Sequence, residues 1–128
     1  MLAGGPGQAA TEVFGAMAGE LGRLRERRHV LLMDQRGTGG SQALACAFPD
    51  DLSAEAATAE VQVAMARDCL DAQEADVAMY TSSVAVRDIE ALRLAVGSPA
   101  LNVYGGSYGT RVAQEYARQF PASVRPLV

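Results

Sequence analysis

The chain has 128 residues, of which 49% are hydrophobic and 20% charged, so residues 1–128 have the length and apolar content of one compact domain. The formal net charge of −4 argues against nucleic acid or an anionic membrane as a partner. All eleven basic residues are arginine, which excludes P-loop, Schiff-base and Ser-Lys chemistry. With one histidine and two cysteines, the sequence lacks the ligand clusters that structural or catalytic zinc requires, so we expect no metal and no cofactor.

The first eight residues, Met-Leu-Ala-Gly-Gly-Pro-Gly-Gln, form a glycine-rich turn where a complete domain normally begins with a strand or a helix. We therefore expect the native N-terminus of a longer parent protein to lie upstream. No apolar run approaches the roughly 18 residues that cross a bilayer, and no signal peptide is visible. The parent could be either cytoplasmic or exported.

The next part of the chain predicts a helix, a strand and a turn. From Thr11 to Arg28 the apolar residues recur at helical spacing, as Phe14, Met17, Leu21 and Leu24. The continuous apolar run His29–Met33 is typical of a strand that is buried on both faces of a parallel sheet. The turn that follows covers residues 34–41, Asp-Gln-Arg-Gly-Thr-Gly-Gly-Ser.

The middle of the chain predicts one further helix. Ser53 is a suitable N-cap, and Val61, Met65 and Cys69 would share one face of the helix.

The C-terminal part alternates helices and strands. A helix is expected from about Thr81 to Gly97, a buried strand over residues 100–104, and a second helix that ends at Pro121. The apolar stripes of the two helices are Ala85, Ile89, Leu92 and Val96 in the first, and Val112, Tyr116 and Phe120 in the second. Leu127 and Val128 would begin a third strand. This alternation predicts an α/β fold in which a parallel sheet with few strands is flanked by helices.

The strongest chemical motif is Gly-x-Ser-x-Gly at residues 105–109, between the predicted strand and the second helix. This context is typical of a nucleophile elbow, with Ser107 at the tip of a sharp turn. Gly105 and Gly109 have no Cβ to clash with neighbouring backbone, and the following helix directs its positive end toward Ser107. The alternative is an ordinary glycine-rich turn before a helix.

Two more motifs precede the elbow in the order that an α/β-hydrolase would require. Gly4-Gly-Pro-Gly7 stands where such enzymes place an oxyanion loop after the third strand, although a simple β-turn is the alternative. With the turn at residues 34–41 and the elbow at residues 105–111, the chain resembles α/β-hydrolase peptidases that include proline iminopeptidases and tripeptidyl aminopeptidase-like proteins. Ala3 stands where proline iminopeptidases have a histidine, so the tripeptidyl aminopeptidase branch is the more similar one.

The resemblance implies roles for several residues. Ser107 would be the nucleophile, and the backbone N–H groups of Tyr108 and of Gly4 or Gly5 would form the oxyanion hole. The implied reaction is acyl transfer through an acyl-enzyme, on the N-terminus of a peptide or, in some relatives, on small esters or amides. Asp34 and Arg36 would hold their loop together, with a contact to substrate as the alternative.

The resemblance also implies that the catalytic partners of Ser107 are missing. In this fold an Asp or Glu and then a His follow the serine in the chain, so both would lie beyond residue 128 and this chain would be an incomplete part of the fold. The single histidine, His29, would stand about 15 Å from the elbow along the sheet, beyond the reach of a general base. We therefore expect the isolated chain to be inactive.

Three questions stay open from the sequence. Cys46 and Cys69 either form a disulfide or are two buried thiols. The chain could instead be a catalytically dead remnant that serves as a binding module, with self-association through exposed sheet edges. A nucleotide-binding domain is disfavoured, because neither glycine-rich turn completes Gly-x-Gly-x-x-Gly.

Overall fold

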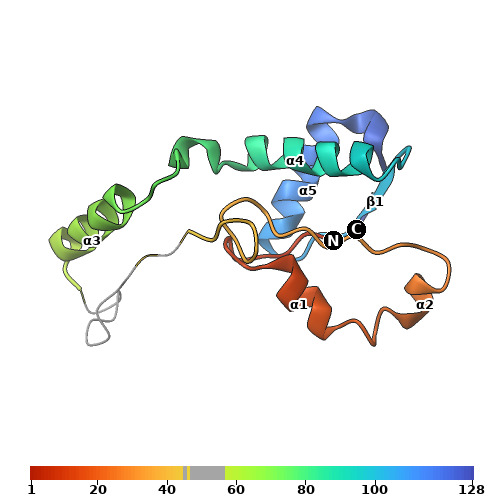
Figure 1. Ribbon diagram of the computed structural model, residues 1–128, viewed down its shortest axis with the longest axis horizontal. Coiled ribbons are helices and arrows are strands. Elements are labelled where there is room, and N and C mark those ends of the chain that lie inside the picture. The colour runs from red at the N-terminus through yellow and green to blue at the C-terminus, as the bar shows by residue number, and fades with distance from the viewer. Residues whose placement is uncertain (45, 47–56) are drawn as a thin grey trace. The chain divides into compact units, whose positions relative to one another are not determined.

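The computed structural model describes residues 1–44, 46 and 57–128 (Figure 1). The chain divides into two compact units, the first made of Met1–Ala43 and Tyr80–Val128 and the second of Leu44–Met79. Among the described residues, no helix combines the length and the apolar character that a membrane crossing requires.

The first unit is built on two parallel strands and two helices. Strand β1 (Leu101–Val103) pairs with β2 (Val124–Leu127), with Leu101 opposite Val124. Helix α4 (Ser82–Ala95) precedes β1, and helix α5 (Tyr108–Gln119), followed by the short 3₁₀ helix η2 (Pro121–Ser123), connects the two strands. The predicted α/β class with a parallel sheet and flanking helices is confirmed, although β2 begins three residues earlier than expected.

The main core forms where α4 and α5 pack against each other beside β1. Its buried members are Leu2, Val86, Ile89, Val103, Val112, Ala113 and Tyr116. Full burial of one such aliphatic side chain contributes about 1.5–3 kcal/mol. The predicted stripes are therefore largely correct, except that Val96 lies beyond the end of α4 and is 49% exposed.

The predicted helix from Thr11 to Arg28 is wrong as a single element. Two short helices, α1 (Ala10–Ala16) and α2 (Gly22–Arg25), are separated by turns. The segment contains three glycines, which disfavour a continuous helix, and only its first turns find a core, in which Phe14 packs with Ala3 and Ala10.

The predicted strand His29–Met33 is also wrong, because no ladder forms along it. Its backbone receives a hydrogen bond at the Leu31 carbonyl from the Met1 amino group, at 2.8 Å. A parallel strand needs a series of such bonds with a neighbour of similar length, and Met1 supplies a single one. The residues from Val30 to Met33 are consequently half-buried instead of covered on both faces.

The second unit contains helix α3 (Ala59–Asp71) and the 3₁₀ helix η1 (Val77–Met79). The cap of α3 is Thr58, whose hydroxyl accepts a hydrogen bond from Val61 N–H, so the helix starts later than predicted. The proposed cap Ser53 lies outside the described residues. The structure joins Cys46 to Cys69 by a disulfide with a Cα–Cα distance of 5.2 Å.

Candidate active site

Ser107 stands at the sharp turn between β1 and α5. Its backbone has φ 51° and ψ −120°, a conformation that costs a residue with a Cβ atom about 1–3 kcal/mol. The residue is exposed, and it is the N-cap of α5, so it faces the positive end of that helix. The turn thus presents Ser107 at its apex, between an extended segment and a helical start.

Close backbone packing explains the two glycines of the motif. A Cβ atom on Gly105 would lie 2.5 Å from the Gly109 carbonyl oxygen, and one on Gly109 would lie 2.8 Å from the Ala3 carbonyl oxygen and in contact with that of Leu2. Any side chain at either position would therefore push strand, helix and loop apart. By contrast, a Cβ atom on Gly106 would meet nothing within 4 Å.

The glycine-rich loop at the start of the chain lies directly beside the elbow. Leu2 N–H donates to the Tyr104 carbonyl at 2.8 Å, and Gly106 N–H donates to the Leu2 carbonyl at 3.1 Å. These bonds bring Gly4 so close that a Cβ atom on it would lie 2.9 Å from Cβ of Ser107. Two motifs from opposite ends of the sequence therefore form one site.

The other two residues expected at the oxyanion hole lie next to this contact in the chain. Tyr108 follows Ser107 and is the first residue of α5, so its N–H has no acceptor within the helix. Gly5 follows Gly4 with φ +101°, a conformation that glycine adopts readily.

Sequence reasoning missed Ser82, which contacts the tyrosine beside the nucleophile. The Oγ atom of Ser82 and the phenolic oxygen of Tyr108 are 2.5 Å apart. Ser82 is the first residue of α4, and the bond therefore ties that helix to the start of α5. Because 26 residues separate the two, no local pattern in the sequence indicates this contact.

Asp34 holds its own loop together, as predicted. Its carboxylate accepts hydrogen bonds from the Thr11 N–H at 2.9 Å, from the Thr11 hydroxyl at 2.8 Å and from the Gly40 N–H at 3.0 Å. These bonds, the one from Thr11 N–H first, lower the pKa of Asp34 below its ordinary value. The carboxylate thus fastens the loop to the start of α1.

Arg36 ties the same loop to α4 through Asp88, a second residue that sequence reasoning missed. Its Nε and Nη2 atoms donate to the two carboxylate oxygens of Asp88 at 2.7 and 2.6 Å. This hydrogen bonding is the main reason why the pKa of Arg36 is raised. Both side chains are about one-third exposed, so the pair contributes only about 0–1 kcal/mol.

His29 does not take part in this arrangement. It is exposed and lines a cavity of about 1430 Å³, and Ser107 is not among the residues that line this cavity. Within the described ranges, the hydrogen bonds of the elbow do not involve His29, and no group of three His, Cys, Asp or Glu side chains could hold a metal ion.

The whole chain, residues 1–128, matches the family of the α/β hydrolase fold. The chain belongs to this family. It is also 30% identical to the serine protease Hip1 of Mycobacterium tuberculosis over 143 aligned residues, and to the putative hydrolase YuaR of Escherichia coli K12 over 131. The tripeptidyl aminopeptidase of Streptomyces lividans is 30% identical over 108 residues.

These relatives are much longer proteins than this α/β hydrolase chain. The alignments cover 98% of the chain but 27% of the Mycobacterium protease, and 100% of the chain but 26% of the Escherichia protein. For the Streptomyces aminopeptidase the shares are 74% and 20%. The chain therefore spans about a quarter of the length of these relatives.

Proposed function

We propose that this chain carries the nucleophile part of a serine peptidase site, with Ser107 as the nucleophile. The observation that supports the proposal most strongly is the contact of the exposed, positive-φ Ser107 with Gly4 at the N-terminus of α5. A strained, exposed serine at a helix start, with a glycine-rich loop close to it on one side, suits attack on a carbonyl carbon. The conformation of Ser107 costs folding free energy, and residues strained in this way cluster at active sites.

In the proposed reaction, the Ser107 hydroxyl oxygen attacks the carbonyl carbon of a substrate and loses its proton to a base. The carbonyl oxygen becomes an oxyanion, which the N–H groups of Tyr108 and of Gly4 or Gly5 would stabilise together with the positive end of α5. Collapse of the intermediate breaks the C–N bond, the protonated base gives its proton to the leaving amine, and an acyl group stays on Ser107. Water then hydrolyses this acyl-enzyme to a carboxylic acid and restores the Ser107 hydroxyl.

A peptide that is cleaved from its N-terminus is the substrate class that we favour. Two similar proteins are named a serine protease and a tripeptidyl aminopeptidase, which supports peptidase chemistry over other hydrolase chemistry. Small esters or amides are the alternative on the same site, since they pass through the same acyl-enzyme.

We infer in addition that residues 1–128 alone do not turn over such substrates. The only histidine of the sequence is His29, and it lines a cavity that Ser107 does not reach. Without a base the hydroxyl is a weak nucleophile, and an oxyanion hole with binding alone leaves only about 10³–10⁴-fold acceleration over water. Turnover at the rate of ordinary enzymes, about 1–10³ per second, is therefore not expected.

Labelling with a fluorophosphonate tests the nucleophile, and a turnover assay tests the inferred inactivity. We expect the reagent to add slowly to Ser107, faster when imidazole is supplied as a base, as read by intact mass and peptide mapping. The Ser107→Ala variant should not be labelled. The rate of peptidyl nitroanilide hydrolysis should be the same for this variant and for the parent chain.

The two parts of the proposal fail in different ways. Labelling that falls on Ser41 or Ser82 and leaves Ser107 untouched contradicts the assignment of the nucleophile. Rapid hydrolysis that disappears in Ser107→Ala upholds the nucleophile and refutes the inactivity of the isolated chain.

A further inference from the structure

The N–H group that follows the proposed nucleophile is part of a rigid planar group. The Tyr108 N–H and the Ser107 carbonyl belong to the same peptide bond, so the direction of one sets the direction of the other. Thr110 holds the carbonyl, because its N–H donates to the Ser107 oxygen at 3.0 Å and its hydroxyl donates to the same oxygen at 2.7 Å. One end of this peptide group is therefore fixed within α5 itself.

The other end of the peptide group is held through the side chain of Tyr108. The ring is half-buried and packs against the main core. Its phenolic oxygen lies 2.5 Å from Oγ of Ser82, the first residue of α4. A tyrosine that packs along its ring and hydrogen-bonds at its tip satisfies both its apolar and its polar part. The first residue of α5 is thus fastened to the core and to a neighbouring helix.

The partner that Ser82 offers to Tyr108 is itself well anchored. Gln119, the last residue of α5, donates from Nε2 to the Ser83 carbonyl at 3.1 Å. The first turn of α4 thus contacts both the first and the last residue of α5. Val86, one turn further along α4, is fully buried in the main core. The position of the Ser82 hydroxyl is therefore set by the packing of α4 on α5.

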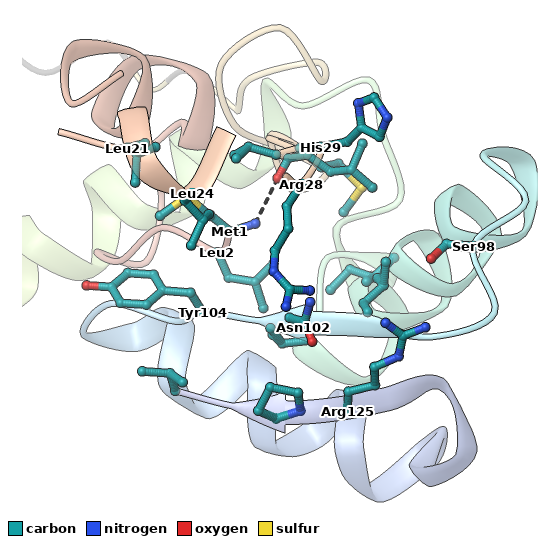
Figure 2. A pocket seen from close by; sticks show the side chains of 18 of the residues that line it. Met1, Leu2, Leu21, Leu24, Arg28, His29, Ser98, Asn102, Tyr104 and Arg125 are labelled. Atoms are coloured by element: carbon teal, nitrogen blue, oxygen red, sulfur yellow. Dashed lines mark hydrogen bonds between the residues drawn. The ribbon is translucent and has the colours of Figure 1, made fainter. Parts of the chain in front are cut away.

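The contact between Ser82 and Tyr108 lies outside two cavities of the first unit. Neither residue lines the cavity of about 1430 Å³, whose lining includes His29 and Tyr104 (Figure 2). Neither lines the cavity of about 450 Å³ beside Arg36. The two hydroxyl groups are instead hydrogen-bonded to each other. This arrangement favours a role in positioning over a role in ligand binding.

We propose that Ser82 is a positioning residue for the oxyanion hole, a role that rests on the proposed function of Ser107 as the nucleophile. While Thr110 holds the Ser107 carbonyl, the peptide group can still pivot about that oxygen. The bond between Ser82 and Tyr108 fixes a second point and so directs the Tyr108 N–H. Oxyanion donors stabilise the developing charge because they are oriented before the reaction begins. Ser82 acts through Tyr108 and needs no contact with the substrate.

The rate at which a fluorophosphonate labels Ser107, with imidazole as the base, tests this role. In that reaction Ser107 Oγ bonds to phosphorus, fluoride leaves, the hydroxyl proton passes to imidazole, and the phosphonyl oxygen takes the place of the oxyanion. Loss of a whole oxyanion donor lowers a rate about 10²–10³-fold, so loss of its orientation should lower the maximal labelling rate on the order of ten-fold. The reagent concentration that gives half of the maximal rate should stay unchanged.

A set of variants isolates the hydrogen bond. Tyr108→Phe and Ser82→Ala each remove one hydroxyl, and each should show the full loss of rate. The double variant should be no slower than either single one, because both hydroxyls act through one bond. Ser82→Thr keeps a hydroxyl and should restore most of the rate. Ser83→Ala is the matched control on the same turn, since its hydroxyl lies 3.1 Å from that of Thr81, and it should be labelled like the parent chain.

The outcomes separate this role from the proposed function. If the parent chain is not labelled at Ser107, the nucleophile is wrong and the role of Ser82 is wrong with it. If Ser107 is labelled equally fast in every variant, the nucleophile stands and the positioning role alone is wrong. Additive losses in the double variant, or an equal loss in Ser83→Ala, contradict an action through this bond. Urea unfolding identifies a purely structural role, in which both single variants lose stability or fail to fold while the folded chain keeps its labelling rate.

Discussion

Residues 81–128 and residues 10–33 both show apolar residues at regular spacing, but only the first region forms the predicted elements. In residues 81–128 the two helices α4 and α5 cover each other and β1 pairs with β2. In residues 10–33 the helix breaks after Ala16 and the apolar run after His29 forms no ladder. The difference is the presence of a packing partner, because periodicity describes a face that must find something to cover it.

The two regions also differ in their relation to Ser107. Ser107 lies in the region whose elements support one another, and its strained backbone persists because β1, α5 and the loop at Gly4 surround it. Residues 10–33 contribute Phe14 to a small core and several residues to the lining of the cavity of about 1430 Å³. The strained residue Ser107 thus lies in residues 81–128, the region whose elements pack against one another.

The largest expected effect tests the packing that supports the elbow. Gly109→Ala places a Cβ atom against the Leu2 and Ala3 carbonyl oxygens, which cannot move without shifting the loop that contacts Ser107. Because both neighbours are backbone atoms, we expect the free energy of unfolding to fall by about 1–3 kcal/mol or more. Urea unfolding followed by circular dichroism measures it.

The matched control is Gly106→Ala, in the same turn and with open space around the new methyl group. It should leave the stability of the chain nearly unchanged. If both variants lose the same stability, the turn is merely intolerant of substitution and close packing at Gly109 is not what supports the elbow.

The second effect concerns the polar cluster that joins α4 to α5. The Glu90 carboxylate accepts hydrogen bonds from Arg93 at 2.7 Å, from the buried Tyr116 hydroxyl at 2.8 Å and from the Ser123 hydroxyl at 3.1 Å. Arg93 first, and then the two hydroxyls, lower the pKa of Glu90 to about 2. Glu90→Gln removes the charge and should cost about 1–3 kcal/mol, since it weakens several bonds to groups shielded from water.

The same carboxylate predicts a dependence on pH. Its pKa is lower in the folded chain than the ordinary 4.5, so its contribution to stability is complete above about pH 4.5 and is lost as the pH falls toward 2. The stability of Glu90→Gln should therefore fall less steeply over this window than that of the parent chain. A parallel fall in both would show that other carboxylates, such as Asp34, dominate the acid sensitivity.

The sequence predicts this site better than it predicts the fold around it. The Gly-x-Ser-x-Gly motif predicts the elbow from local rules, since Gly105 packs against the Gly109 carbonyl within the same turn. The contact of Gly109 with the Leu2 and Ala3 carbonyls joins distant parts of the chain. The partners Ser82 and Asp88 could not be predicted, because their contacts with Tyr108 and Arg36 depend on how α4 packs. Whether a segment forms a strand likewise depends on a pairing partner that is distant in the sequence. A window of neighbouring residues does not identify this partner.

The smallest expected effect concerns residues 10–33, the region with fewer packing partners. Gly15 lies inside α1, and a Cβ atom added there would meet nothing within 4 Å. Gly15→Ala should raise the free energy of unfolding by about 0.5–1 kcal/mol, because alanine loses less conformational freedom in a helix than glycine does. The gain would be smaller than the loss at Gly109, as expected where local propensity acts without tertiary contacts.

Gly97→Ala is the opposite control, since Gly97 has φ +67° just after α4 and alanine there should be destabilising. A gain at both positions would indicate that the two regions differ in glycine content alone, and not in the packing partners available to them.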